Sequence, residues 1–339
     1  MKPNPQNSVF SPHPEDDHWE NTLRPQRLEE FLGQQKVVAN LKIYLQAAQK
    51  RQEVLDHILF SGAPGLGKTT LAHLIATEMG VTLRATSGPI LEKAGDLAGL
   101  LTSLQKGDIL FIDEIHRLKP IVEEYLYSAM EDFCIDVMLD QGPNARSITI
   151  HLPPFTLIGA TTREGLLSAP FRARFGILEK LDLYPPNELE QILLRSAKIL
   201  NVHIDPDAAQ LLSQRCRGTP RIANRIIRRI RDLAEVQSGG HISVEIAQKG
   251  LEMLGVDEHG LEEMDRKILK VLLQHQGGPV GLKTIAVSVG EEERTIEDVY
   301  EPYLIQQGFL LKTPRGRVAS PKTLQYFRQT QSYPQSFLF

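Results

Sequence analysis

The stretch His57-Ile-Leu-Phe-Ser-Gly-Ala-Pro-Gly-Leu-Gly-Lys-Thr69 decides the fold. It begins with a short apolar run typical of a buried strand and continues into a glycine-rich turn. A helical pattern follows over residues 69–79, and Gly80 is a plausible stop. Residues 62–69 fit G-x-x-x-x-G-K-[ST], in which glycines let backbone N–H groups turn toward phosphate oxygens. This strand–loop–helix context favours a phosphate-binding loop over an ordinary glycine turn.

Each residue of this loop is expected to make a different contact with a bound triphosphate. Lys68 is expected to reach the β- and γ-phosphates, and the hydroxyl of Thr69 is expected to ligate Mg²⁺. Gly65, Gly67 and Thr70 are assigned to the same nucleotide contact. The sequence therefore predicts ATP and Mg²⁺ as cofactors.

A second apolar strand, Asp108-Ile-Leu-Phe-Ile-Asp113, ends in two acidic residues. Asp113 is predicted to hold Mg²⁺ through water, and Glu114 to polarise the attacking water as a general base. A pair of solvated carboxylates is the ordinary alternative. Their place after a phosphate loop favours hydrolysis, because a small-molecule kinase would not need the glutamate to activate water.

A third strand, over residues 155–161, ends in two threonines. Ligands bind at the carboxyl ends of strands in a doubly wound sheet, so Thr161 is predicted to sense the γ-phosphate, with Thr162 as the second choice. A threonine that caps the following helix is the alternative. Strands that alternate with helices predict an α/β fold with a doubly wound parallel sheet.

Several arginines follow the third strand. Arg172 and Arg174 lie in Pro170-Phe-Arg-Ala-Arg-Phe-Gly176, and they could be a simple surface pair. An arginine finger is worth about 10³–10⁵ in the rate of phosphoryl transfer. If a neighbouring subunit supplies it, activity requires a ring. Arg221, just inside a later helix, is predicted to reach back to the nucleotide from a second domain.

Composition limits the class of protein. Two cysteines in no metal spacing, and the lack of any long apolar run, predict a cytoplasmic protein without disulfides or a membrane segment. The net charge of −4 argues weakly against nucleic acid as a partner. However, no acidic residue follows Glu301, and this local basic excess favours phosphate contact over a merely solvated face.

The pattern along the chain predicts four parts. They are a disordered extension over 1–18, a large ATPase domain over 19–184 with a hairpin at 133–152, a small domain over 185–255 that is helical without strands, and a DNA-binding head over 258–339. In the head, a third helix over 295–307 carries acidic residues and argues against base reading. The following two-strand wing presents Lys312, Arg315 and Arg317 to DNA phosphates, which gives a grip without sequence preference.

From about Trp19 onward the chain resembles the RuvB family of bacterial Holliday-junction branch-migration ATPases, within the AAA+ class. The segments that carry the resemblance are 23–28 (LRPQRL), 62–72 (GAPGLGKTTLA), 110–118 (LFIDEIHRL), 159–176 (GATTREGLLSAPFRARFG), 217–225 (RGTPRIANR), 277–282 (GGPVGL), 295–310 (TIEDVYEPYLIQQGFL) and 313–317 (TPRGR). Clamp loaders and other AAA+ proteins share the first few of these segments but not the C-terminal ones.

The resemblance implies further roles. It implies a winged-helix head, a homohexameric ring on double-stranded DNA at Holliday junctions, docking of the 133–152 hairpin on RuvA, and RuvC as another partner. It puts one of the two close arginines in the neighbour's active site, and we favour Arg172 as the finger and Arg174 as a nucleotide contact. Further nucleotide contacts that it implies are Leu23, Arg24, Glu131, Asp132, Phe133 and Tyr184.

The chain departs from the family pattern in its head. Arg294 ends a Glu-Glu-Glu-Arg run where relatives often carry Glu-Glu-Arg-Glu, which shifts its expected DNA contact by one position. Lys312 stands where arginine is frequent, and lysine cannot contact a phosphate bidentately. Two rival interpretations remain: a clamp-loader-type assembly factor, which would need a helical collar, and a non-enzymatic DNA-binding regulator, which intact Lys68, Asp113 and Glu114 oppose.

Overall fold

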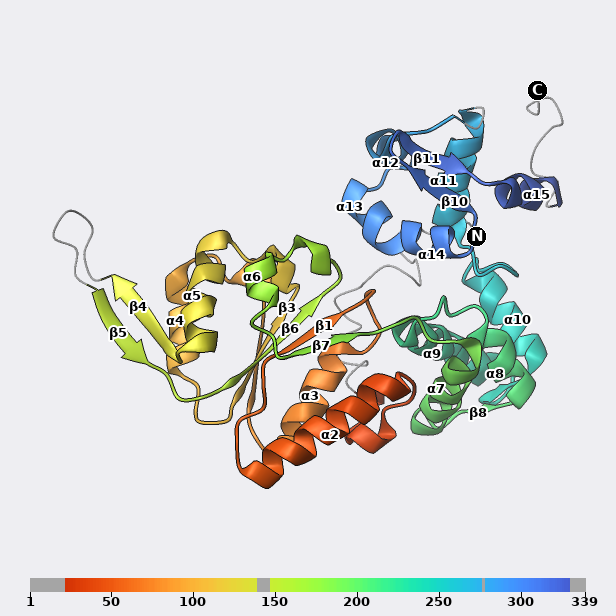
Figure 1. The fold of residues 1–339 in the computed structure, drawn as a ribbon. Coiled ribbons are helices and arrows are strands. Elements are labelled where there is room, and N and C mark those ends of the chain that lie inside the picture. The colour runs from red at the N-terminus through yellow and green to blue at the C-terminus, as the bar shows by residue number, and fades with distance from the viewer. Residues whose placement is uncertain (1–21, 139–146, 276–277, 330–339) are drawn as a thin grey trace. The chain divides into compact units, whose positions relative to one another are not determined.

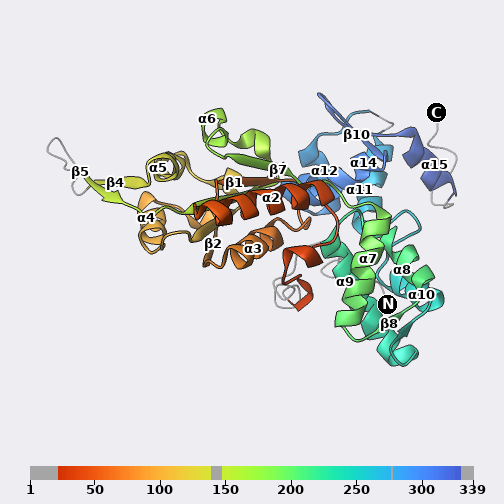
Figure 2. The same ribbon diagram turned by 60° about the horizontal axis from the view of Figure 1, so that its bottom comes forward.

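A computed structural model describes residues 22–138, 147–275 and 278–329 of the chain (Figures 1 and 2). The chain divides into two compact units. One contains Glu20–Glu188 with Thr219–Arg221, and the other contains Leu189–Gly218 with the chain from Ile222 onward. Among the described residues, no helix is both long and apolar enough to cross a membrane.

The first unit is built on a five-stranded parallel sheet with the strand order β2-β3-β6-β1-β7. The strands are β1 (Ile58–Ser61), β2 (Leu83–Ser87), β3 (Ile109–Asp113), β6 (Thr156–Thr161) and β7 (Ile177–Lys180). The central strands β1 and β6 are buried along their whole length. Continuous apolar runs suit strands that are covered on both faces, which is why these segments fold as a parallel sheet.

Helices cover the sheet in this unit, as Figure 1 shows. They are α2 (Gln35–Arg51), α3 (Lys68–Met79), α4 (Ala94–Thr102), α5 (Pro120–Glu131) and the short α6 (Ala169–Arg172), with 3-10 turns at Leu28–Glu30, Gly88–Ile90, Ile115–Arg117 and Glu164–Leu166. Leu97 of α4 and Leu126 of α5 pack with Leu110 and Ile112 of β3 in one buried cluster. Helix α3 contacts β2, β3 and β6. The predicted doubly wound α/β fold is confirmed.

The predicted hairpin is present as β4 (Cys134–Met138) and β5 (Ser147–His151), which both views show projecting from the sheet. The strands are antiparallel, with Cys134 opposite His151 and Ile135 opposite Ile150. Ile135 is buried, whereas Ile148 is 49% exposed. The hairpin thus keeps an apolar root in the core and exposes an apolar side chain further out. Its turn lies outside the described residues, as does the predicted disordered extension.

The second unit begins with a helical segment. Its helices are α7 (Pro186–Ile199, whose first residues belong to the first unit), α8 (Pro206–Ser213), α9 (Pro220–Gln237) and α10 (Val244–Met253). The prediction that this region has no strands was wrong, because β8 (His203–Ile204) and β9 (His241–Ile242) form a parallel pair. Strands of two residues are too short to show the alternating pattern by which strands are recognised.

The C-terminal part of this unit has winged-helix architecture. Its elements are α11 (Glu263–Gln274), α12 (Leu282–Val289), α13 (Glu293–Thr295), a π-helical turn (Ile296–Tyr300), α14 (Glu301–Gln306), β10 (Leu310–Thr313), β11 (Gly316–Ala319) and α15 (Pro321–Gln329). The predicted regular third helix is therefore broken into three pieces. Pro302 explains this, because it has no N–H to donate to the turn before it. The wing is the β10–β11 ribbon, as predicted.

Candidate functional site

The strand register brings the predicted catalytic residues to one edge of the sheet. Ser61 of β1 is paired with Thr161 of β6, and the Gly62 N–H donates to the Thr161 carbonyl at 3.2 Å. On the other side of β6, Ile112 of β3 is paired with Gly159, so β3 ends in Asp113 at the same edge. The phosphate loop, Asp113 and Thr161 therefore lie together at the carboxyl ends of three adjacent strands.

Lys68 is a buried cation at the first position of α3. Its Nζ donates to the carbonyls of Gly62 and Ala63, each at 2.8 Å. Burial lowers the pKa of Lys68 to about 8, and the nearby charge of Asp113 only partly opposes this. The ammonium group therefore sits where an incoming polyanion would stabilise its charged form.

The loop glycines are required by their surroundings. Gly67 caps α3 with a φ of 101° and offers no side chain to the first-turn amides, which stay available for an anion. A Cβ at Gly65, where φ is 76°, would lie 2.8 Å from atoms of Thr219 and Arg221. The Arg221 N–H also donates to the Gly65 carbonyl at 3.4 Å. Arg221 thus lies beside the phosphate loop, and Thr70 lies in the first turn of α3.

The acidic pair sits on an unusual backbone turn. The Glu114 N–H donates to Oδ1 of Asp113 at 2.8 Å, and Glu114 adopts a left-handed φ of 47°. The carboxylate of Glu114 accepts a 2.6 Å hydrogen bond from Arg117. Asp113 and the Thr69 hydroxyl offer oxygen donors, the ligands that Mg²⁺ prefers. This donor set, beside a buried lysine, fits a divalent cation bound with nucleotide.

Thr161 has a partner that the sequence did not reveal. Its Oγ1 lies 3.0 Å from Nδ1 of His116 and accepts a 3.0 Å hydrogen bond from the Arg163 N–H. Thr161 is 1% exposed, so these contacts fix its hydroxyl. His116 lies in the segment Leu110–Leu118 that carried the family resemblance, but spacing alone does not show that its ring returns to β6.

Two of the residues expected to contact the nucleotide have buried side chains. Leu23 is 5% exposed, and Tyr184 is 4% exposed. The Tyr184 hydroxyl donates to the Leu66 carbonyl in the phosphate loop at 3.3 Å. Burial raises the pKa of Tyr184, so the phenol keeps its proton. Arg24 lies near His73, whose pKa is lowered by burial and further by this positive charge.

The arginines predicted as finger and nucleotide contact belong to a separate group around α5 and α6. Arg172 lies 3.4 Å from Glu164 and is 46% exposed. Arg174 pairs with Glu131 at 2.5 Å and stacks over the Tyr127 ring at 4.6 Å. Within the part of the chain that the structure describes, no hydrogen bond or ion pair joins this group to Lys68 or Asp113.

The rest of the family's nucleotide-contacting segment lies at the end of α5. Asp132 is the C-terminal cap of that helix. The Phe133 ring packs against Phe155 at 5.9 Å between ring centroids, so much of it serves the core. The structure therefore places the end of α5, through the Glu131–Arg174 ion pair, with the arginine group.

The wing has an internal charge network. Arg317, whose side chain is 12% exposed, holds Glu301 through bonds of 2.5 and 3.0 Å, and these hydrogen bonds raise its pKa. Lys312 lies 3.0 Å from Glu297. Arg294, on α13, lies 3.4 Å from Asp298. Arg315 is exposed at the turn between the strands.

The phosphate loop, the acidic strand end and the sensor threonine at one edge of a parallel sheet define a P-loop ATPase. Three family models match consecutive parts of the chain. They describe the Holliday junction DNA helicase RuvB P-loop domain over residues 23–181, the RuvB AAA lid domain over 184–257 and the RuvB C-terminal winged helix domain over 258–328. The chain belongs to the RuvB family.

Individual relatives agree over nearly the full length. The chain is 60% identical to the Holliday junction branch migration complex subunit RuvB of Myxococcus xanthus, over 96% of each chain. It is 57% identical to that of Chlorobaculum tepidum, over 97% of this chain and 96% of the relative. A solved structure of Thermotoga maritima RuvB, described as a Holliday junction branch migration motor, superposes with a TM-score of 0.83 at 50% identity and covers 91% of this chain and 98% of its own.

Proposed function

We propose that this chain is the ATP-driven motor subunit that moves Holliday junctions along DNA, acting with the junction-binding protein RuvA. The observation that carries the proposal is the convergence of Lys68, Asp113 and Thr161 at one sheet edge in a chain that also ends in a winged helix. Membership of the RuvB family joins these two parts into one activity. The chain uses nucleotide with a divalent metal ion.

Within one subunit, each residue of the sheet edge has a proposed task. Lys68 and the amides of the loop hold the phosphates, and Thr69 and Asp113 would hold Mg²⁺, which neutralises phosphate charge when bound. Glu114 polarises the attacking water once its carboxylate turns from Arg117. Thr161, fixed by His116, reports the γ-phosphate. Leu23, Arg24, Tyr184 and Arg221 complete the nucleotide pocket.

The position of the arginines supports a ring of subunits. Arg172 is exposed and makes only a long ion pair with Glu164, so it is available to a second subunit. We assign Arg172 as the finger that enters the neighbour's site, with Arg174 and the segment from Glu131 to Phe133 as further contacts from the same side. A homohexamer is the assembly that we propose for this arrangement.

The winged helix supplies the grip on double-stranded DNA. Glu297 and Glu301 are held by the wing cations Lys312 and Arg317, which leaves Arg315 as the exposed positive group of the turn. Contacts of this kind bind phosphates without reading bases, as a motor that moves over any sequence requires. Arg294, Lys312 and Arg317 join the grip if DNA competes with their carboxylate partners.

Further parts of the proposal concern partners and organisation. The β4–β5 hairpin, with exposed Ile148, is the surface that we assign to RuvA, and RuvC is a further partner. A cytoplasmic location belongs to the same proposal, because the substrate is chromosomal DNA. We also keep residues 19–184, 185–255 and 258–339 as the proposed domains. The clamp-loader alternative needs a helical collar, and this chain has a winged helix in its place.

Dissociation of a synthetic four-way DNA junction tests the proposal. We expect ATP-dependent conversion of the junction to duplex products, greatly stimulated by RuvA. Control reactions contain ADP, or a linear duplex of the same sequence. ATP turnover without junction movement in the presence of RuvA would favour an assembly factor, and no turnover at all would favour a non-enzymatic regulator.

A further inference from the structure

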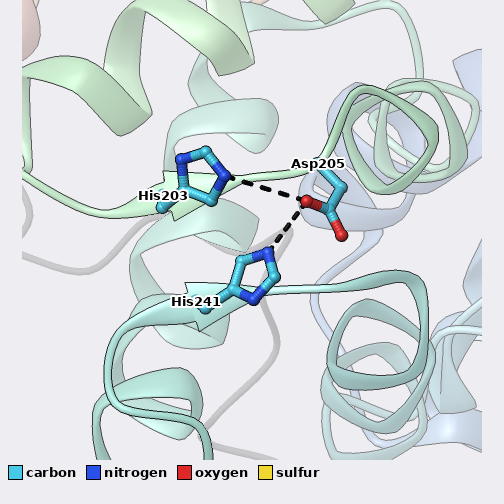
Figure 3. A group of neighbouring side chains, drawn as sticks. All are labelled: His203, Asp205 and His241. Carbon is cyan, nitrogen blue, oxygen red and sulfur yellow. Dashed lines mark hydrogen bonds and ion pairs between the residues drawn. The ribbon is translucent and has the colours of Figure 1, made fainter.

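Three side chains capable of binding a metal ion meet on the short β8–β9 ribbon of the second unit. They are His203, Asp205 and His241, and their ligand atoms all lie within 4.8 Å of one another. Figure 3 shows the two imidazole rings on neighbouring strands, each turned toward the Asp205 carboxylate. This group has no place in nucleotide hydrolysis or in the DNA grip described above.

The backbone explains why the three side chains converge. His203 and Asp205 are two residues apart on an extended segment, so they point to the same face. The intervening Ile204 and its partner Ile242 are buried on the opposite face. His241 lies directly opposite His203 in the parallel register, and the Asp205 N–H donates to the Ile242 carbonyl at 3.0 Å. The cluster is therefore positioned by the ribbon itself.

The Asp205 side chain is directed to the histidines at the expense of its usual role. Asp205 is the N-cap residue of α8, where an aspartate commonly accepts a hydrogen bond from a first-turn amide. Here its side chain makes no cap hydrogen bond. Its Oδ1 instead lies 2.8 Å from Nε2 of His241 and 3.9 Å from Nε2 of His203.

These distances are close to those of a coordination sphere. Zinc takes imidazole nitrogen and carboxylate oxygen at about 2.0–2.2 Å, so tetrahedral ligand atoms lie about 3.3 Å apart. One of the two observed separations is shorter and the other longer than this value. Each of these two separations would change by only about half an ångström, and the third, between the two imidazole nitrogens, is at most 4.8 Å and would shorten as the ion binds. All three side chains are at least one-third exposed, which leaves room for that adjustment.

Nearby charge also favours a cation. Glu245, at the start of α10, lies close enough to Asp205 for the two negative charges to interact. Its pKa is lowered, mainly by a hydrogen bond from Ser243, so it stays ionised. A second carboxylate thus lies near Asp205, whose two imidazole neighbours lie 4.9 Å apart between ring centroids.

We propose that His203, Asp205 and His241 form a binding site for a divalent transition-metal ion of the zinc type. Two imidazoles and one carboxylate suit zinc and its neighbours better than Mg²⁺ or Ca²⁺, which prefer oxygen ligands alone. The ion would tie β8, which leads into α8, to β9, which leads into α10. Three protein ligands leave a position for water, so the site clamps the helical segment reversibly.

Zinc binding to the full-length, tag-free protein tests this proposal. The protein is first treated with chelator, kept free of nucleotide and titrated with Zn²⁺ by calorimetry and thermal unfolding. Co²⁺ is then added in a separate experiment, because imidazole and carboxylate coordination gives it a visible absorption spectrum. We expect saturable binding of one zinc ion per chain at this cluster, a rise in unfolding temperature on binding, and a cobalt spectrum that zinc abolishes.

His203→Gln is the most informative variant. The His203 side chain is 77% exposed, and its contacts are a 3.9 Å approach to Asp205 and a ring contact with His241, so its loss should change the stability of the metal-free protein little. We expect at least roughly tenfold weaker zinc binding and loss of the cobalt spectrum. His275→Gln, at an exposed histidine after α11, is the matched control and should bind like the unmodified chain. Equal zinc affinity in the two variants, or no saturable binding in the unmodified chain, would overturn the proposal.

Discussion

We propose that the phosphate loop and the wing both present cations to phosphates, but the structure holds those cations in opposite ways. In the loop, Lys68 is buried and donates to two carbonyls, each 2.8 Å from its Nζ. In the wing, Arg317 is held bidentately by the carboxylate of Glu301. Lys68 therefore lacks a full counter-charge until a ligand binds, whereas Arg317 already has one in Glu301.

This difference matches the two ligands. A nucleotide pocket gains affinity when the incoming phosphate completes the solvation of a buried charge. A DNA grip that must be released at every step gains nothing from a buried, unneutralised arginine. The wing therefore keeps its cations paired with acids of the π-helical turn and α14, and exposes Arg315. The comparison predicts large effects of substitutions at the ATPase site and small, salt-dependent effects at the wing.

The largest expected effect is on turnover by Arg172→Ala. If Arg172 stabilises transition-state charge in the neighbouring site, kcat should fall by about 10³–10⁵ while KM for ATP changes little. Arg174→Ala is the comparison, because Arg174 is tied to Glu131 and should mainly raise KM. Steady-state ATPase assays with DNA present give both parameters. A larger loss of kcat in Arg174→Ala would assign the finger to Arg174 instead.

The next largest effect is the loss of ATP turnover caused by Lys68→Ala. Removal of a preorganised cation at the transferred phosphate should lower kcat by about 10²–10³ or more, and junction movement should stop with it. Lys106→Ala changes an exposed lysine of the same unit and should behave as the unmodified chain does. Assays of ATP turnover and junction dissociation are run in parallel. Junction movement that survives in Lys68→Ala would refute the motor mechanism.

An effect of moderate size is expected in the proton uptake that accompanies nucleotide binding. The pKa of Lys68 is lowered to about 8 without nucleotide, so the amine is half-protonated near that pH. Bound phosphate restores its charge, and nucleotide binding at pH 8 should take up about half a proton, which vanishes well below pH 8. Calorimetry in buffers of different ionisation enthalpy measures this uptake. Lys68→Met should abolish it, and uptake that persists in that variant would locate the proton elsewhere.

The same lowered pKa has a consequence for stability. Between about pH 8 and the ordinary lysine value of 10.5, the unfolded chain binds the proton that the folded chain has lost. The free energy of unfolding of the nucleotide-free protein should therefore rise with pH through that window. Lys68→Met should remove this rise in pH-dependent denaturation experiments. A rise of equal size in the variant would mean that another group is responsible.

The smallest expected effect is at the wing. Arg315→Ala should reduce the slope of log affinity for DNA against log salt by about one. Lys270→Ala, on α11, is the control and should leave the slope unchanged. Glu301→Gln sharpens the comparison, because it releases Arg317 and should make the slope steeper. If neither Arg315→Ala nor Glu301→Gln changed the slope, the wing would not contribute to DNA binding.

The sequence was sufficient where a pattern spans a whole element. The apolar runs that became β1, β3 and β6 are continuous, so they predicted the parallel sheet and the edge at which Asp113 and Thr161 meet. Spacing could not show contacts made across the fold. The approach of His116 to Thr161 and the pairing of Arg317 with Glu301 join residues 45 and 16 positions apart, and they depend on how loops return to the sheet and the wing.

Short or interrupted elements could not be predicted from the sequence either. The β8–β9 ribbon has too few residues for an alternating pattern, although it brings His203 beside His241. The interruption at Ile296–Tyr300 follows from a single proline in an otherwise helical pattern. The assignment of Arg172 to a neighbour came from the chemistry of hydrolysis and the family resemblance, and it stays a prediction.

Subunit mixing tests the shared active site most directly. Lys68→Ala has no working phosphate loop but keeps Arg172, and Arg172→Ala has an intact loop but no finger. Each variant alone should be inactive, whereas an equimolar mixture should regain ATP turnover, because the finger of the first completes the site of the second. A mixture that stays as inactive as its two components, although both assemble into rings with DNA, would contradict hydrolysis between subunits.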